Sequence, residues 1–103
     1  MARELPPKPR KVSDEEVRDT ILMMCREAGL MGSIKPEDVA RTVLPDFWQT
    51  LTKRIRLTSK QLAAAGKIVI LRKGKIADPN DFKGIYRLQI TETGLNDEDD
   101  RGE

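Results

Sequence analysis

Apolar positions in the first part of the chain repeat at the spacing of an amphipathic helix. Ser13 and Glu16 begin this segment as a capping box, in which the hydroxyl and the carboxylate satisfy backbone N–H groups of the first turn. Gly29 provides the left-handed residue that commonly ends a helix. The pattern therefore predicts a first helix between Ser13 and Gly29. Its buried side carries Val17, Ile21, Met24, Cys25 and Ala28.

A second, shorter helix is predicted after a loop and a very short strand at Ile34. Pro36 suits its first turn, where a missing N–H is tolerated, and Pro45 ends it because proline disfavours helical geometry in the residue before it. Asp46 is the expected cap of the next helix, with Gln49 as its capping-box partner. A tight turn therefore joins the second and third helices. The second helix turns inward the apolar residues Val39, Ala40, Val43 and Leu44.

The third helix is predicted from Phe47 to Ala65, a length of about 28 Å, and Gly66 ends it. One stripe of this helix is apolar and faces the core; it consists of Trp48, Leu51, Ile55 and Leu62. The opposite side carries three cations around one outward leucine: Lys53, Arg56, Leu57 and Lys60. Arg54 lies at the edge of that side. We expect this basic face to be the candidate binding surface.

Two β-branched runs, 68–71 and 85–90, predict strands in the second half of the chain. The two-residue period of a strand places Tyr86 and Leu88 on one face and Arg87 on the other. Between the runs, residues 73–84 predict a long, turn-rich hairpin loop. Cations gather in and beside this loop: Arg72, Lys73, Lys75 and Lys83.

These elements predict an α+β fold, a winged helix-turn-helix with three helices and a small antiparallel β-hairpin as the wing. In that architecture the third helix enters the major groove of DNA and the wing runs along the flanking backbone. The domain is expected over residues 13–91. Residues 1–12, which are proline-rich and basic, and residues 92–103, which are acidic, are expected to be disordered tails. The acidic tail either keeps the protein soluble or competes with nucleic acid for the basic half.

Charge divides unevenly along the 103 residues. Residues 13–46 hold four cations and eight anions, whereas residues 47–91 hold ten cations and two anions, so these stretches carry net charges of −4 and +8. The formal net charge of the whole chain is only +2. A basic half of this kind favours a polyanionic partner such as nucleic acid, although a solvated basic helix face without a ligand is also common.

The residue types that most enzymes need are missing from the sequence. There is no histidine and only one cysteine, Cys25, on the expected buried stripe, so no Cys/His or Ser/His/Asp arrangement and no histidine zinc motif exists. No glycine-rich phosphate-binding motif is present either. We therefore expect no enzymatic activity, no metal and no cofactor. A single unpaired thiol and the lack of a secretory or membrane-spanning run favour the cytoplasm.

Several short motifs together resemble a known family. They are the stretch 33–41 (SIKPEDVAR), then Trp48, Arg56, Leu62 and Gly66–Ile68, then Gly74, Asp78–Pro79 and Lys83–Leu88. Over roughly residues 17–90 the chain resembles the bacterial family catalogued as domain of unknown function thirty-two fifty-three. The resemblance implies a small winged-helix-like bacterial fold with no established activity.

Two functions of different classes follow. The first is binding of double-stranded DNA by a transcriptional regulator, with contacts from Lys53, Arg54, Arg56 and Lys60 on the third helix and from Arg72, Lys73, Lys75 and Lys83 in the wing. The second is a protein-interaction module or homodimer that binds through the apolar residues Leu57 and Phe82, without nucleic acid. We expect the first.

Overall fold

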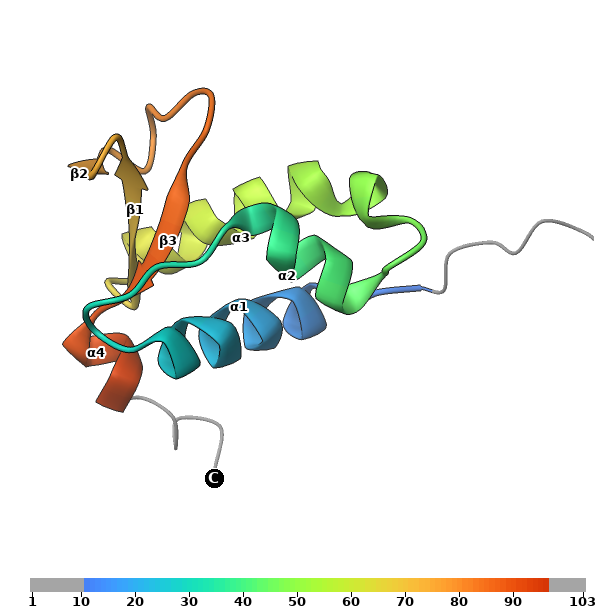
Figure 1. The fold of residues 1–103 in the computed structure, drawn as a ribbon, viewed down its shortest axis with the longest axis horizontal. Helices are drawn as coiled ribbons and strands as arrows, with labels where there is room; N and C mark the ends of the chain where they lie inside the picture. Colours follow the sequence, from blue (N-terminus) through green and yellow to red (C-terminus); the bar gives the residue numbers. More distant parts are fainter. Residues whose placement is uncertain (1–10, 97–103) are drawn as a thin grey trace, which may run out of the picture.

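Three helices pack against one another and meet a small antiparallel sheet at one end (Figure 1). The computed structural model describes residues 11–96. The helices are α1 (Asp14–Ala28), α2 (Pro36–Val43) and α3 (Thr52–Ala64), and the 3-10 turn η1 (Trp48–Leu51) leads into α3. The strands are β1 (Ile68–Arg72), β2 (Lys75–Ala77) and β3 (Arg87–Ile90), and they are followed by a short helix, α4 (Glu92–Asn96). The predicted α+β class is confirmed, and the architecture is compatible with a winged-helix-like fold.

Helix α1 begins and ends where the sequence predicts. The Ser13 hydroxyl accepts a hydrogen bond from the Glu16 backbone N–H at 3.0 Å, and the Gly29 N–H closes the helix on the Cys25 carbonyl at 3.0 Å. The buried stripe includes Leu22, which we did not predict, and excludes Ala28, which is exposed. Because α2, α3 and β3 all cover α1, its buried face is wider than one row of residues.

The predicted short strand at Ile34 is confirmed as a single bridge to β3. The Ile34 N–H donates to the Leu88 carbonyl at 2.8 Å, and the Leu88 N–H donates back at 2.9 Å. Helix α2 then begins at Pro36 and stops before Pro45, as expected. Its inward residues Val39, Ala40 and Val43 are buried, together with Leu44.

The predicted start of the third helix is wrong. Residues 48–51 form the 3-10 turn η1, and neither η1 nor α3 has a side-chain cap, so the capping box at Asp46 does not form. The Thr50 hydroxyl instead donates to the Phe47 carbonyl at 2.7 Å, and the Thr52 hydroxyl donates to the Gln49 carbonyl at 3.1 Å. Threonine side chains that bind nearby carbonyls favour such local turns over a regular helix start.

The sheet has the strand order β2-β1-β3, and all neighbours are antiparallel. The loop predicted over residues 73–84 is therefore too long, because residues 75–77 form β2. Lys73 and Gly74, with φ of 54° and 80°, form the two-residue turn between β1 and β2, in which positive φ is required. Strand β2 escapes sequence analysis because it has three residues and its central Ile76 is exposed.

The core lies between the helices and the sheet. Its largest fully buried side chains come from α1, α3, β1 and β3: Ile21, Ile55, Ile68, Ile70 and Leu88. Ile70 faces Leu88 across the β1–β3 ladder, and Ile68 faces Ile90. Of the predicted inward residues of the third helix, Leu51, Ile55 and Leu62 are buried and Trp48 is half-buried.

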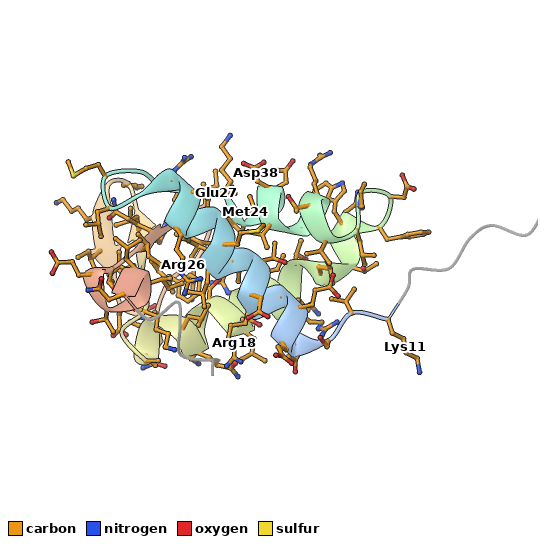
Figure 2. All side chains as sticks on the ribbon, turned by 90° about the horizontal axis from the view of Figure 1, so that it is seen from below. Lys11, Arg18, Met24, Arg26, Glu27 and Asp38 are labelled. Atoms are coloured by element: carbon orange, nitrogen blue, oxygen red, sulfur yellow. The ribbon has the colours of Figure 1, made fainter. Side chains whose placement is uncertain are left out.

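Ordered structure continues beyond Thr91, where we expected the acidic tail to begin. The Thr91 hydroxyl accepts a hydrogen bond from the Gly94 N–H at 3.0 Å and donates to the Gly66 carbonyl at 2.6 Å, so it caps α4 against the end of α3. The Arg26 guanidinium reaches the Gly94 carbonyl at 3.4 Å, and Figure 2 shows Arg26 on α1 beside α4. Residues 97–103 lie outside the described residues.

The predicted N-terminal tail also lies outside the described residues, except for residues 11 and 12. Of these, Val12 is half-buried and packs against the core. Among the described residues, contact with the core therefore already includes the residue before the capping serine of α1.

The close packing of α4 generates the first prediction. A Cβ on Gly94 would collide with the Lys67 carbonyl oxygen and would lie 2.8 Å from Ile90 Cδ1. Gly94→Ala is therefore expected to lower the free energy of unfolding by about 1–3 kcal/mol, measured by urea denaturation. Thr93→Ala, at the exposed neighbouring position, is the matched control and should change it by less than about 0.5 kcal/mol. Equal stability of the two variants would contradict the packing of α4.

Candidate nucleic-acid interface

The outer side of α3 is open to solvent, as the helical periodicity predicts. Lys53 and Lys60 are exposed, and Leu57 between them is 56% exposed. Neither lysine has a hydrogen bond or an ion pair with a described residue. Because α1 and β1 cover the other side of the helix, the outward groups face solvent or the loop beside them.

A shallow groove of about 240 Å³ separates this side of α3 from the connection between β2 and β3. Its lining brings together the four predicted residues of the outer face with three residues of the connection: Lys53, Arg56, Leu57, Lys60, Pro79, Asn80 and Phe82. None of these side chains is acidic. The groove therefore presents three cations and one exposed leucine to whatever enters it.

Arg56 lines the groove, and contacts with two aromatic rings fix the position of its guanidinium. Its guanidinium carbon lies 4.3 Å from the ring centroid of Phe82 and 5.5 Å from that of Tyr86. The two rings meet edge to face, with centroids 4.9 Å apart. Among the described residues, Arg56 has no carboxylate partner and no hydrogen-bond acceptor. Stacking orients the guanidinium while its N–H donors stay available.

The position of Phe82 corrects one expectation. Phe82 is only 5% exposed and belongs to the core beside Tyr86, so it is not the exposed anchor that a partner protein would need. A turn brings it there: Asp78 pairs with Asp81, and the Asp78 carboxylate accepts a hydrogen bond from the Asn80 N–H at 2.9 Å. The turn folds the connection back, which buries the ring.

Arg54 lies outside the groove, and its charge is compensated. Its guanidinium donates to the Asp14 carboxylate at 2.8 Å, which links α3 to the first turn of α1. The sequence places Arg54 at the edge of the basic face, and this part is correct. The ion pair with a residue 40 positions away has no signal in the sequence.

The four predicted wing cations are spread over different segments, and none of them lines the groove. Lys73 and Lys75 are exposed on the β1–β2 hairpin, and Lys83 is exposed directly after Phe82. Arg72 is half-buried, with its Nε 3.5 Å from the Ile85 carbonyl oxygen. These three lysines have no ion pair with another described residue, whereas Arg72 braces the loop that leads into β3.

A second cavity, of about 370 Å³, adjoins the groove and was not predicted. Lys53 and Arg56 line both, and Pro36, Glu37, Trp48, Thr52 and Tyr86 complete the second one. The Arg41 guanidinium lies 4.5 Å from the Trp48 ring centroid. Helical periodicity predicts a core position for Trp48. Periodicity cannot show that η1 places the indole beside this cavity.

Tyr86 lines the second cavity and lies beside Arg56, which lines both. Burial raises the pKa of its hydroxyl above the ordinary value, and the Arg56 guanidinium partly offsets this by favouring the phenolate. The hydroxyl is therefore a neutral hydrogen-bonding group at physiological pH. Within residues 11–96, no three thiol or carboxylate groups are arranged to hold a metal ion. No helix of the described chain has the length and apolar character required to cross a membrane.

The fold and the groove define a small α+β domain, compatible with a winged-helix-like class, whose α3 carries three cations without an ion-pair partner among the described residues: Lys53, Arg56 and Lys60. The family model described as "Protein of unknown function (DUF3253)" matches residues 14–91. The chain belongs to this family, and the resemblance read from the sequence is confirmed. A search of curated proteins finds no match.

Burial of Cys25 generates the second prediction. Desolvation raises the pKa of this thiol from 9.0 to about 12, so at pH 8 only about one thiol in ten thousand is ionised. In the folded protein, iodoacetamide should therefore alkylate Cys25 only as fast as the protein unfolds, whereas denatured protein should react within minutes. The pKa of Cys25 is higher in the folded protein than in the unfolded protein. The contribution of the neutral thiol to the free energy of unfolding is therefore complete below about pH 9 and is lost as the pH rises towards about 12. Rapid alkylation of folded protein, measured by mass spectrometry, would contradict this burial.

Proposed function

We propose that this protein is a non-enzymatic, cytoplasmic DNA-binding protein that regulates transcription through α3 and the adjoining loops. One observation carries the proposal: the groove beside α3 holds Lys53, Arg56 and Lys60, and no carboxylate lines it. Unpaired cations on one helix face are what the phosphates of a duplex bind, and a guanidinium with free donors matches the acceptors of guanine. The unpaired buried thiol supports a reducing compartment.

The dimensions of α3 support a duplex as the partner. Its 13 residues span about 20 Å, and a major groove about 12 Å wide admits one helix. Leu57 projects between the two lysines, where an apolar side chain would meet the methyl group of thymine. The outer face of α3 therefore combines phosphate-binding, base-reading and apolar groups.

The third prediction concerns salt. Five of the eight proposed contact residues are exposed lysines without a described partner: Lys53, Lys60, Lys73, Lys75 and Lys83. If each neutralises one phosphate, the logarithm of the binding constant should fall against the logarithm of salt concentration with a slope of about −4.5. Fluorescence anisotropy with a random-sequence duplex at several sodium chloride concentrations measures this slope. A flat dependence would rule out the proposed mechanism.

Two adjacent residues provide a matched pair of variants for the same titration. Lys53→Gln should reduce the steepness of the slope by about 0.9, because one phosphate contact is lost. Arg54→Gln removes the same charge, but Asp14 already compensates Arg54, so the slope should change much less. Equal effects of the two variants would show that total charge, and not the groove, determines binding.

The fourth prediction assigns sequence reading to Arg56. Arg56→Lys keeps the charge but loses the planar guanidinium, so the preference for a site selected from a random duplex pool should fall by about 1–3 kcal/mol. Lys73→Ala is the control and should weaken binding similarly on all sequences. Competition binding with selected and scrambled duplexes measures both. An unchanged preference in Arg56→Lys would remove Arg56 from base reading.

A protein-interaction module is the second candidate. Exposed apolar residues favour it, because Leu57 on α3, Ile76 on β2 and Ile85 before β3 are 56%, 72% and 90% exposed. Phe82 no longer contributes to this candidate, since it is buried. Concentration-dependent dimerisation by light scattering, without any DNA binding, would favour this function over the first.

A further inference from the structure

The cavity between α2, η1 and α3 has the composition of a small-ligand site. Its volume of about 370 Å³ falls at the small end of the range of protein ligand pockets. Three of its lining residues, Pro36, Trp48 and Tyr86, offer flat apolar surfaces, and Lys53 and Arg56 offer positive charge. Cavities of this kind fix a ligand by apolar contact and orient it by a few polar groups.

The balance of charge in this cavity favours an anion. Glu37 is the only acidic side chain in the lining, and its carboxylate accepts a hydrogen bond from Arg41 Nε at 2.8 Å. Lys53 and Arg56 have no such partner among the described residues. The two cations are therefore uncompensated, whereas the one carboxylate is neutralised by an arginine outside the lining.

The aromatic residues favour a flat ring. Arg41 covers the Trp48 ring at 4.5 Å from its centroid, which orients the indole beside the cavity. Tyr86 is 8% exposed, and its hydroxyl has no hydrogen-bond partner in the described part of the chain. Within the described residues the buried side-chain atoms without a hydrogen-bond partner are Arg26 Nε and Ser59 Oγ, so the Tyr86 hydroxyl is instead open to solvent at the cavity, where it can bind a polar group of a ligand.

We propose that this cavity binds a small aromatic carboxylate. The ring packs against Trp48 and Tyr86, and the carboxylate accepts hydrogen bonds from the Lys53 ammonium and the Arg56 guanidinium. Because the same two cations line the groove beside α3, ligand and DNA compete for them. This competition rests on the proposed function, whereas the ligand site itself does not.

Benzoate is the probe for the site, and Trp48 is the reporter. Trp48 is the one tryptophan of the chain, so ¹⁵N-labelled protein gives a single indole N–H signal in a two-dimensional NMR spectrum. Benzoate should shift this signal saturably, with a dissociation constant on the order of 1 mM for so small a ligand. Benzamide, which is flat but neutral, and cyclohexanecarboxylate, which is charged but not flat, should each bind at least about fivefold more weakly. A shift that does not saturate, or equal affinities for the three compounds, would overturn the proposal.

Exposed lysines provide the matched variants. Lys53→Gln should weaken benzoate at least about fivefold, and Lys75→Gln, on the β1–β2 hairpin, should leave the affinity unchanged. Both side chains are exposed, so neither variant puts folding at risk. Unchanged benzoate affinity in Lys53→Gln would overturn the assigned site.

Competition is measured separately. At constant ionic strength set with sodium chloride, benzoate should lower the anisotropy of a bound fluorescent duplex, and cyclohexanecarboxylate at the same concentration should not. If the protein binds no duplex or benzoate displaces none, the competition is rejected. The indole titration still decides the ligand site, so the two failures are distinguishable.

Discussion

Helix α3 must bury one side against both α1 and β1, and the rest of the described fold depends on this constraint. Ile55 and Leu62 fill that side, while the small residues Thr58 and Ser59 are buried with them and let the neighbouring elements approach. The burial of this side removes apolar surface from water, which is the main driving force for a core of this size. The opposite side carries the exposed Leu57 and three cations, of which Arg56 meets the rings of Phe82 and Tyr86.

Two arginines close together on α3 show that tertiary contacts determine whether a charge is paired with a carboxylate. Arg54 meets the Asp14 carboxylate at the start of α1, so its charge serves to join two helices. Arg56, two residues on, meets the rings of Phe82 and Tyr86 and no carboxylate among the described residues. An aromatic face orients a guanidinium without occupying its donors, whereas a carboxylate occupies them. The proposed DNA contact and the proposed ligand site both depend on this difference.

The second half of the chain illustrates how composition misleads about order. Glu92 and the acidic residues after it have the composition of a solvated tail, yet Glu92–Asn96 forms a helix. The hydrogen bonds of Thr91 and the absence of a side chain at Gly94 allow that helix to sit directly on the backbone of Lys67. The close packing at Gly94 depends on the position of Lys67 in the fold, which the composition of this segment does not reveal.

Local patterns were sufficient for much of the fold. The cap at Ser13, the stop at Gly29, the second helix between its prolines and the outward position of Lys53, Leu57 and Lys60 follow from interactions within a few residues of the chain. Local patterns failed at η1, where threonine hydroxyls compete with the predicted cap, and at β2, which is too short to show a period.

The sequence by itself therefore determined α1, α2, most of α3, β1 and β3, the α+β class and the basic outer face of α3, because helical and strand periods are properties of neighbouring residues. Only the tertiary structure decided that Phe82 is buried, that Arg54 is paired, and that Lys53 and Arg56 line two adjoining cavities. Each of these depends on contacts between segments far apart in the chain, such as Arg54 with Asp14 and Arg56 with Phe82. The partners of these charged and aromatic side chains are therefore set only when the core packs the distant segments together.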